Sequence, residues 1–187
     1  MKQILISAGH SNKDPGAVNG SHKESVIAVD FRDAIYYALY SKLGKSVKVV
    51  RDGAKDGDNQ SLNDAIKLAK ESDIAIEIHL NAATSKAAHG SEALCHKDKA
   101  ILAKNLCAAI NDATNGVISP RGDAGGWKSA SSGQHARLGF CEAGGVILEL
   151  GFISNNNDLG TLLSNKEQWA IIRGVTDVIV EHLAGLK

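Results

Sequence analysis

Two histidines and two glutamates of this sequence could together bind a metal ion and move a proton. His10 and His79 each follow an apolar, strand-like run, and Glu149 follows a third such run directly. Glu24 comes fourteen residues after His10, at the start of a helical pattern. Because ligands and reactive groups collect at the carboxyl ends of strands in open α/β sheets, we expect all four side chains to meet at one sheet edge.

This set of side chains suits zinc. In hydrolases, zinc is usually held by three protein ligands from His, Glu, Asp or Cys, with a further position left for water. His10, Glu24 and His79 would supply two imidazoles and a carboxylate, and the ion would lower the pKa of its bound water to about 7. Glu149 would stay free as general base and acid, with apolar neighbours that should raise its pKa. The ligand spacing follows no short motif such as H-E-x-x-H, so the residues alone leave the assignment open.

The elements that must position these residues alternate along the chain. Short β-branched runs predict strands, and apolar residues repeating every three or four positions predict helices. We predict an α/β, three-layer domain in which a central, mostly parallel twisted sheet of about six strands is flanked by helices. The expected strands are residues 3–8, 47–50, 74–79, 91–95 and 146–150, and the expected helices are residues 23–43, 61–69, 98–110 and 165–183.

The stretch from Asn115 to Gly145 is harder to interpret. It holds most of the clustered glycine and serine, and residues 138–141 are a candidate strand. Loops of this length inside a compact domain are often functional. We therefore predict a flap or a wall of the substrate site.

The composition is that of an ordinary globular protein. The chain has 187 residues, 43% apolar and 22% charged, with zero net charge, which fits a single domain over residues 1–187. We expect no nucleic-acid partner, because there is no basic excess, and no membrane insertion, because no apolar run is long enough. The three widely spaced cysteines predict reduced thiols. Since a core strand follows Met1 almost at once, we expect no signal peptide and synthesis in the cytoplasm.

Several segments resemble a known family and occur in that family's order. They are Ser7-Ala8-Gly9-His10 with Lys13-Asp14-Pro15-Gly16-Ala17, Lys23-Glu24, Ile78-His79-Leu80-Asn81-Ala82, Gly90-Ser91-Glu92, and Leu148-Glu149-Leu150-Gly151-Phe152-Ile153-Ser154-Asn155. Together they cover the chain from end to end. The sequence is in this respect similar to the zinc-dependent N-acetylmuramoyl-L-alanine amidases of the amidase-3 family.

The resemblance implies roles and a substrate. It implies that His10, Glu24 and His79 bind Zn²⁺ and that Glu149 is the catalytic carboxylate. The implied reaction is hydrolysis of the amide between the lactyl group of N-acetylmuramic acid and the first L-alanine of the stem peptide, with bacterial peptidoglycan as the partner. It also favours substrate orientation by Asn81, for which the alternative is a local hydrogen bond that closes its strand.

The sequence departs from the family in two places. Many members have Asp-Pro-Gly-His where this chain has Ser7-Ala8-Gly9-His10, so we expect a different turn there, and many have arginine at the position of Glu142. The short loop after His79 leaves little room for the inserted helix that plugs the site of regulated periplasmic members. With no separate wall-binding domain expected, the chain resembles a phage endolysin, or a sporulation-type amidase, released by lysis to act on the cell wall.

Two other functions stay open at this point. A catalytically inactive domain could bind muropeptides in the same cleft, although a pure binder has no need of a free carboxylate beside the metal. Another zinc hydrolase, such as a carboxypeptidase or a deacetylase, could use the same architecture and the same ligands.

Some of the remaining polar and aromatic residues also have two interpretations. Glu77 shares a strand face with His79 and could support that ligand or simply be a paired polar residue. Glu142 is an alternative to Glu149 as the catalytic acid. Trp127 is a candidate platform for sugar or peptide, whereas Trp169 is expected to pack on its helix. The other histidines are His135, which could touch substrate from the flap, and His22, His89, His96 and His182, which are expected in solvent.

Overall fold

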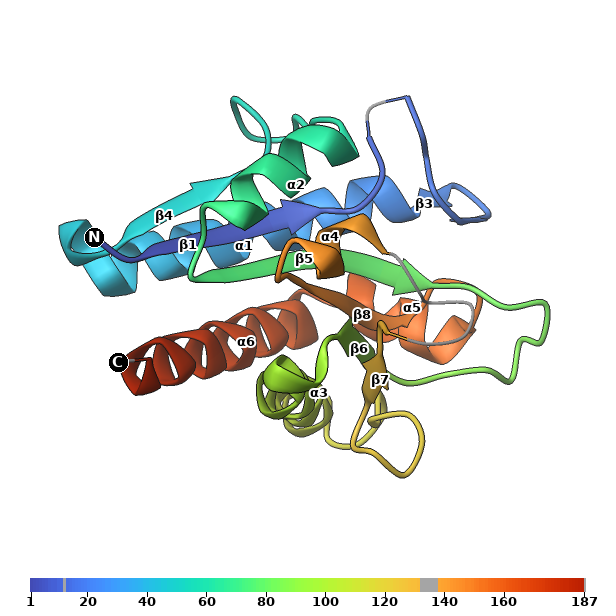
Figure 1. Ribbon diagram of the computed structural model, residues 1–187. Helices are drawn as coiled ribbons and strands as arrows, with labels where there is room; N and C mark the ends of the chain where they lie inside the picture. The colour runs from blue at the N-terminus through green and yellow to red at the C-terminus, as the bar shows by residue number, and fades with distance from the viewer. Residues whose placement is uncertain (12, 132–137, 187) are drawn as a thin grey trace.

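The computed structural model describes residues 1–11, 13–131 and 138–186, and its centre is a six-stranded sheet (Figure 1). The strand order is β4-β1-β5-β8-β6-β7, and every neighbouring pair is parallel apart from β6 and β8. The bounds are β1 Gln3–Ala8, β4 Lys48–Arg51, β5 Ile74–Asn81, β6 Glu92–Cys95, β7 Trp127–Ser129 and β8 Val146–Phe152. The predicted α/β class with a mostly parallel sheet is confirmed.

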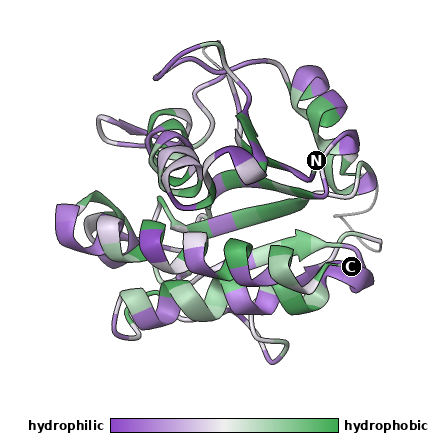
Figure 2. Cartoon of the chain, turned by 90° about the vertical axis from the view of Figure 1, so that its left-hand side faces the viewer, coloured by the Kyte–Doolittle hydropathy of each residue, from purple (hydrophilic) through white to green (hydrophobic). Residues whose placement is uncertain are grey.

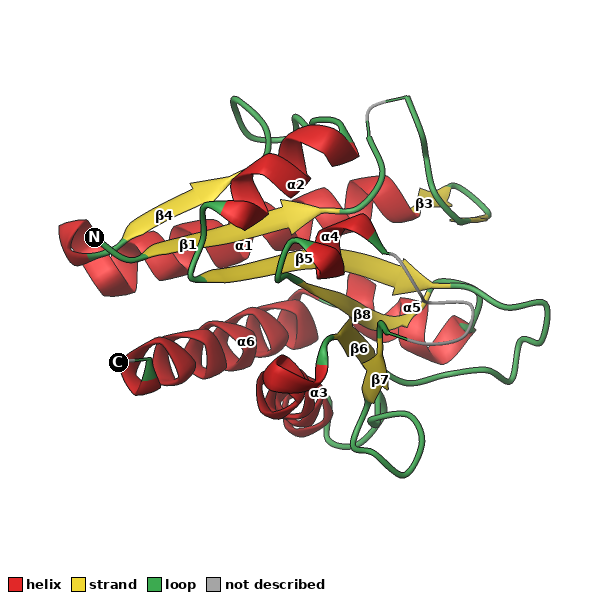
Figure 3. Cartoon of the chain, viewed as in Figure 1, coloured by secondary structure: helices red, strands yellow, loops and turns green. Residues whose placement is uncertain are grey.

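Helices cover both faces of this sheet and give the three predicted layers (Figure 3). One face is covered by the long helices α1 and α6, together with α3 and α5, and the other face is covered by α2 and α4. The bounds are α1 Glu24–Leu43, α2 Leu62–Lys70, α3 Ala100–Ala113, α4 Gly139–Glu142, α5 Asn156–Leu163 and α6 Asn165–Gly185. The short elements are the hairpin of β2 (Val18–Asn19) and β3 (His22–Lys23), and the 3-10 turns η1 (Gly44–Ser46) and η2 (Lys97–Lys99).

The core has two parts because side chains alternate along each strand. Ile4 and Ile6 of β1 belong to the larger cluster, which packs against α1, α3 and α6. Leu5, between them, belongs to the smaller cluster, which packs against α2 and α4. In Figure 2 the strands are mostly green, and the helices carry purple on their outer sides. Burial on both faces explains why these strands are continuous apolar runs.

One predicted element is wrong and others are missing from the prediction. Residues 138–141, the candidate strand, lie mainly in the short helix α4, where Phe140 and Cys141 are buried in the smaller cluster. A four-residue apolar run has no periodicity that could distinguish strand from helix. The strand β7, the β2–β3 hairpin and the helix α5 were not predicted, although Asn155 caps α5 by accepting hydrogen bonds from the backbone N–H groups of Asn157 and Asp158.

The strand order determines where chemistry can take place. β5 lies between β1 and β8, with Ala8 beside Ile78 and His79 beside Glu149. The carboxyl ends of these three strands point to the right in Figure 1, away from both chain termini and toward the loop that leads into α1. Within the described residues, no helix has the length and apolar character needed to cross a membrane.

Candidate metal centre and active site

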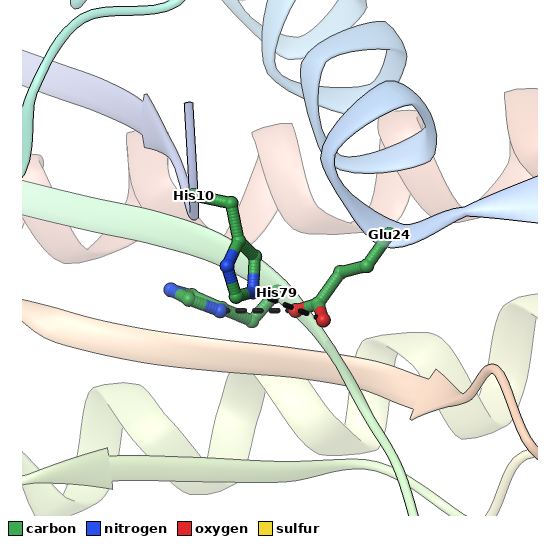
Figure 4. Close-up of side chains that lie close together, drawn as sticks. All are labelled: His10, Glu24 and His79. Atoms are coloured by element: carbon green, nitrogen blue, oxygen red, sulfur yellow. Dashed lines mark hydrogen bonds and ion pairs between the residues drawn. The ribbon is translucent and has the colours of Figure 1, made fainter. Parts of the chain in front are cut away.

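His10, Glu24 and His79 come together at this edge of the sheet (Figure 4). One potential ligand atom from each residue lies within 4.8 Å of the others. Nε2 of His10 is 3.0 Å from Oε2 of Glu24, and Nδ1 of His79 is 3.1 Å from Oε1 of the same carboxylate. The prediction that these three side chains meet is confirmed. They come from the loop after β1, the first residue of α1 and the end of β5.

The outer nitrogen of each imidazole has its own carboxylate partner. Nδ1 of His10 lies 3.0 Å from Oδ2 of Asp14, and Nε2 of His79 lies 3.2 Å from Oε2 of Glu77. Such partners fix the ring orientation and tautomer of a metal-binding histidine. Of the two interpretations of Glu77, direct contact with His79 is the one the structure shows.

Glu24 lies in a pocket of hydrogen-bond donors. Its side chain is buried, and Oε2 accepts from the backbone N–H of Ala17 at 3.0 Å while Oε1 accepts from that of Leu80 at 3.0 Å. Burial alone would raise the pKa of Glu24, but hydrogen bonds from His10, His79 and the two backbone groups hold that pKa well below its usual range. Glu24 is therefore a permanent anion.

The two histidines respond to that anion. Burial opposes charge on His79, yet the hydrogen bonds to Glu24 and Glu77 raise its pKa to about 10. The hydrogen bond to Glu24 also raises the pKa of His10. In the absence of a metal, the cluster thus favours a positive charge between the rings and Glu24. A divalent cation would supply positive charge at the same place. Two imidazoles and one carboxylate are a set of ligands that commonly binds zinc.

Two glycines leave room for the rings. A Cβ atom on Gly9 would lie 2.1 Å from the ring of His79, and one on Gly16 would lie 2.6 Å from the ring of His10. Gly16 also has a φ of +65°, which favours glycine. The glycines of the Gly9-His10 and Pro15-Gly16 pairs are therefore required by the packing of the site itself.

A buried polar network holds the backbone that carries His10. The side-chain amide of Asn59 donates to the carbonyl oxygens of Ala8 and His10 at 3.0 and 3.1 Å. Arg32, which is fully buried, reaches Oδ1 of Asn59 at 3.3 Å and Oδ1 of Asp52 at 3.2 Å. Because His10 has a φ of +68°, an uncommon value for a residue with a side chain, this network fixes a turn that would otherwise relax.

Glu149 lies beside this group but has a different environment. It pairs in register with His79 on the neighbouring strand, and its Oε2 atom is buried without a hydrogen-bond partner among the described residues. Burial raises the pKa of Glu149 to about 7, against the opposing effect of the nearby His79 charge. A carboxyl with this pKa can accept and release a proton near neutral pH.

Two cavities meet at His79. The first, of about 360 Å³, is lined by His10, Asp14 and Glu77 and by apolar side chains of α2 and α4, and we call it the acidic cavity. The second, of about 390 Å³, contains Glu149. His79, Leu138 and Ile147 line both cavities.

We call the second the cationic cavity, because two cations line it. Besides Glu149 it contains Asn81, Glu92, Arg121 and Lys128. The side-chain amide of Asn81 donates through Nδ2 to Oε1 of Glu92 at 2.8 Å, and its Oδ1 accepts from the backbone N–H of Ala82 at 2.9 Å. The local hydrogen bond expected as the alternative for Asn81 is thus present, and its position also leaves it facing the cavity.

The other candidates lie outside this site. Glu142 is exposed and pairs with His96 at 3.3 Å, so it does not compete with Glu149. Trp127 donates to the carbonyl oxygen of Cys95 and packs against the core. The prediction that Trp169 packs on its helix is wrong, because its side chain is 66% exposed.

The other histidines that the structure describes lie outside the metal group. His135 lies outside the described residues. His22 is part of the β2–β3 hairpin, His89 is exposed, and His182 lies near the end of α6. The sequence assigned no role to five residues that shape the site, because each acts through a contact distant along the chain or from an irregular loop. They are Asp14, Asn59, Glu92, Arg121 and Lys128.

The chain is similar to a known protein family and to solved structures. The model of the family Amidase_3, described as N-acetylmuramoyl-L-alanine amidase, matches residues 4–181. A Neisseria meningitidis structure assigned as an N-acetylmuramoyl-L-alanine amidase is 40% identical, with a TM-score of 0.84 over 98% of this chain and 96% of that chain. The catalytic domain of CwlV, an N-acetylmuramoyl-L-alanine amidase from Bacillus (Paenibacillus) polymyxa var. colistinus, is 25% identical, with a TM-score of 0.77 over 98% and 99% of the two chains.

A full-length relative is much longer. The Staphylococcus aureus protein named Probable autolysin PH is 28% identical over 185 residues, which cover 90% of this chain. The chain spans only 37% of that relative's length.

Proposed function

Because the chain belongs to the N-acetylmuramoyl-L-alanine amidase family Amidase_3, we propose that it hydrolyses the amide between N-acetylmuramic acid and L-alanine in bacterial peptidoglycan. One observation carries the proposal. Three side chains that could hold a metal ion meet, and a fourth, Glu149, lies beside them with a buried oxygen that has no partner among the described residues.

We assign His10, Glu24 and His79 as the ligands of a zinc ion. Zinc bound there would polarise the amide carbonyl and make water a stronger acid. Asp14 and Glu77 hold the outer nitrogens of the two imidazoles, so each ring keeps its inner nitrogen toward Glu24. The chain thus provides an arrangement of ligands that is fixed before any ion arrives.

Glu149 would move the proton. Its unpartnered Oε2 accepts a proton from the attacking water as the new C–O bond forms, and then donates that proton to the alanine nitrogen as the C–N bond breaks. The pKa of about 7 suits both directions of this transfer. Removal of this carboxyl should therefore affect catalysis and leave metal binding largely intact.

Product analysis tests the proposal most simply. The purified chain, loaded with zinc, is incubated with isolated peptidoglycan, and the soluble products are analysed by mass spectrometry. We expect stem peptides with a free N-terminal alanine, formed with zinc and not after treatment with a chelator.

The products also separate the alternative functions. Release of a C-terminal amino acid would identify a carboxypeptidase, and release of acetate would identify a deacetylase. Binding of muropeptides without any cleavage would identify a binding domain, and each of these three results would reject the amidase proposal.

A further inference from the structure

We propose that Arg121 and Lys128 form a carboxylate-binding subsite that recognises an acidic residue in the peptide half of the substrate. This inference rests on the proposed amidase function and adds to it a specificity that depends on the peptide's charge. The subsite lies in the cationic cavity, on the same side of His79 as Glu149.

Both cations are held by one buried carboxylate. Oε2 of Glu92 is 2.6 Å from Nε of Arg121 and 2.8 Å from Nζ of Lys128, and the Glu92 side chain is only 3% exposed. At Glu92 two positive charges thus meet one negative charge, and among the described residues neither cation pairs with Glu149, the other acid of the cavity. A single cation would suffice to neutralise Glu92, so the second has capacity for another anion.

The guanidinium of Arg121 is fixed in place before any ligand binds. Its Nη1 donates to the carbonyl oxygen of His89 at 2.9 Å, and its Cζ lies 4.5 Å from the ring centre of Phe152. Within the described residues, Nη2 has no hydrogen-bond partner, and Nζ of Lys128 bonds only to Glu92. Free donors on rigidly held cations lower the entropic cost of binding a carboxylate.

Backbone pairing with the segment around β6 fixes where Arg121 and Lys128 lie along the cationic cavity. Lys128 lies on β7, where it is the register partner of Leu94 on β6, and Arg121 follows the bridge between Ser91 and Pro120. These contacts place both cations along the strand that contains Glu92. The side chain of Arg121 is 31% exposed and that of Lys128 is 38% exposed, so a ligand in the cavity can reach both.

The charges of the two cavities indicate which half of the substrate each cavity binds. No lysine or arginine is found among the described residues that line the acidic cavity, which contains Asp14 and Glu77. In a muropeptide the lactyl carboxyl is consumed by the amide, so the free carboxylates belong to the peptide. Electrostatic complementarity therefore directs the peptide to the cationic cavity and the muramoyl group to the acidic one.

Paired substrates test the subsite. Two muropeptides are compared that differ only at the residue after alanine, which carries either a free α-carboxylate or the corresponding amide. We expect kcat/KM to be about tenfold higher for the carboxylate, equivalent to ~1.4 kcal/mol. In Lys128→Gln this ratio should fall to about twofold or less, whereas Lys128→Arg should keep most of it because the charge is retained.

A matched control uses a lysine on another face. Lys70→Gln, at the exposed end of α2, should keep the ratio of the unmodified chain. Equal rates on both substrates in the unmodified chain, or an unchanged ratio in Lys128→Gln, would overturn the subsite while the amidase function stands. Failure to cleave either substrate would instead reject the proposed function on which the subsite depends.

Discussion

Glu24, which is buried, and Glu149, which is half-buried, are two carboxylates near His79, and their surroundings drive them to opposite behaviour. Glu24 accepts hydrogen bonds from two backbone N–H groups and faces two imidazoles, so its pKa lies well below the usual range. Glu149 has one oxygen with no partner among the described residues, and its pKa rises to about 7. Because their pKa values differ, one carboxylate can stay ionised as a ligand while the other carries a proton in the same site.

The difference between the two regions comes from the backbone. Glu24 opens α1, and its carboxylate reaches free N–H groups on a turn and on the end of β5. Glu149 lies within β8, where the backbone groups are used by neighbouring strands, and its register partner on β6 is another acid, Glu92. Donors surround the first carboxylate, whereas burial raises the pKa of the second, with the charges of Glu24 and Glu92 adding to that effect and the charge of His79 opposing it.

Replacement of His79, which lies near both carboxylates, should have the largest effect on zinc binding and amide hydrolysis. His79→Ala removes one ligand and also the imidazole that pairs with Glu24, so we expect loss of zinc and of all amide hydrolysis. Metal analysis after dialysis measures the first loss, and peptide release measures the second. A variant that kept one zinc per chain would contradict the ligand assignment.

Gly9→Ala should nearly match that effect without removing any functional group. Its Cβ would lie 2.1 Å from the His79 ring, so the ring or the loop must move, at a cost of about 1–3 kcal/mol in the free energy of unfolding. We expect much weaker zinc binding as well. Gly160→Ala in α5, where an added Cβ contacts nothing within 4 Å, is the control and should be neutral or slightly stabilising.

Asn59→Asp tests the support of the His10 turn. The change replaces a donor by an acceptor that faces the carbonyl oxygens of Ala8 and His10, which leaves these groups unpaired. We expect a loss of about 1–3 kcal/mol in unfolding free energy and weaker zinc binding, while His79 stays in place. Asn157→Asp, on the exposed start of α5, should change neither quantity. Normal zinc affinity in Asn59→Asp would show that the turn needs no such support.

The smallest effects should come from the carboxylates behind the ligands, and they should differ. Glu77 is 4% exposed at its side chain and Asp14 is 63% exposed, so water can replace the second far more easily than the first. We expect Glu77→Gln to weaken zinc binding by about 10–100-fold and Asp14→Asn by less. Competition with a chromogenic chelator measures both. A larger effect in Asp14→Asn would mean that exposure does not set the strength of these contacts.

The sequence predicts the main features of the site for a clear reason. His79 lies in the carboxyl-terminal half of its buried strand and Glu149 at the middle of its own, and parallel strands bring their carboxyl-terminal halves to one edge, so their proximity follows from the pattern alone. Asn59 and Arg121 belong to irregular segments, where no periodicity predicts a partner. The same limit applies to α4, since a run of four apolar residues fits a strand as well as a helix.

The separation of roles between the two carboxylates is tested most directly by measuring bound zinc and amide hydrolysis in Glu24→Gln and Glu149→Gln side by side. Our account predicts that Glu149→Gln keeps one zinc per chain while kcat falls by about 10²–10⁴-fold, as for loss of a general acid–base group, and that Glu24→Gln loses the metal. Near-normal hydrolysis by Glu149→Gln, or full zinc occupancy in Glu24→Gln, would contradict it.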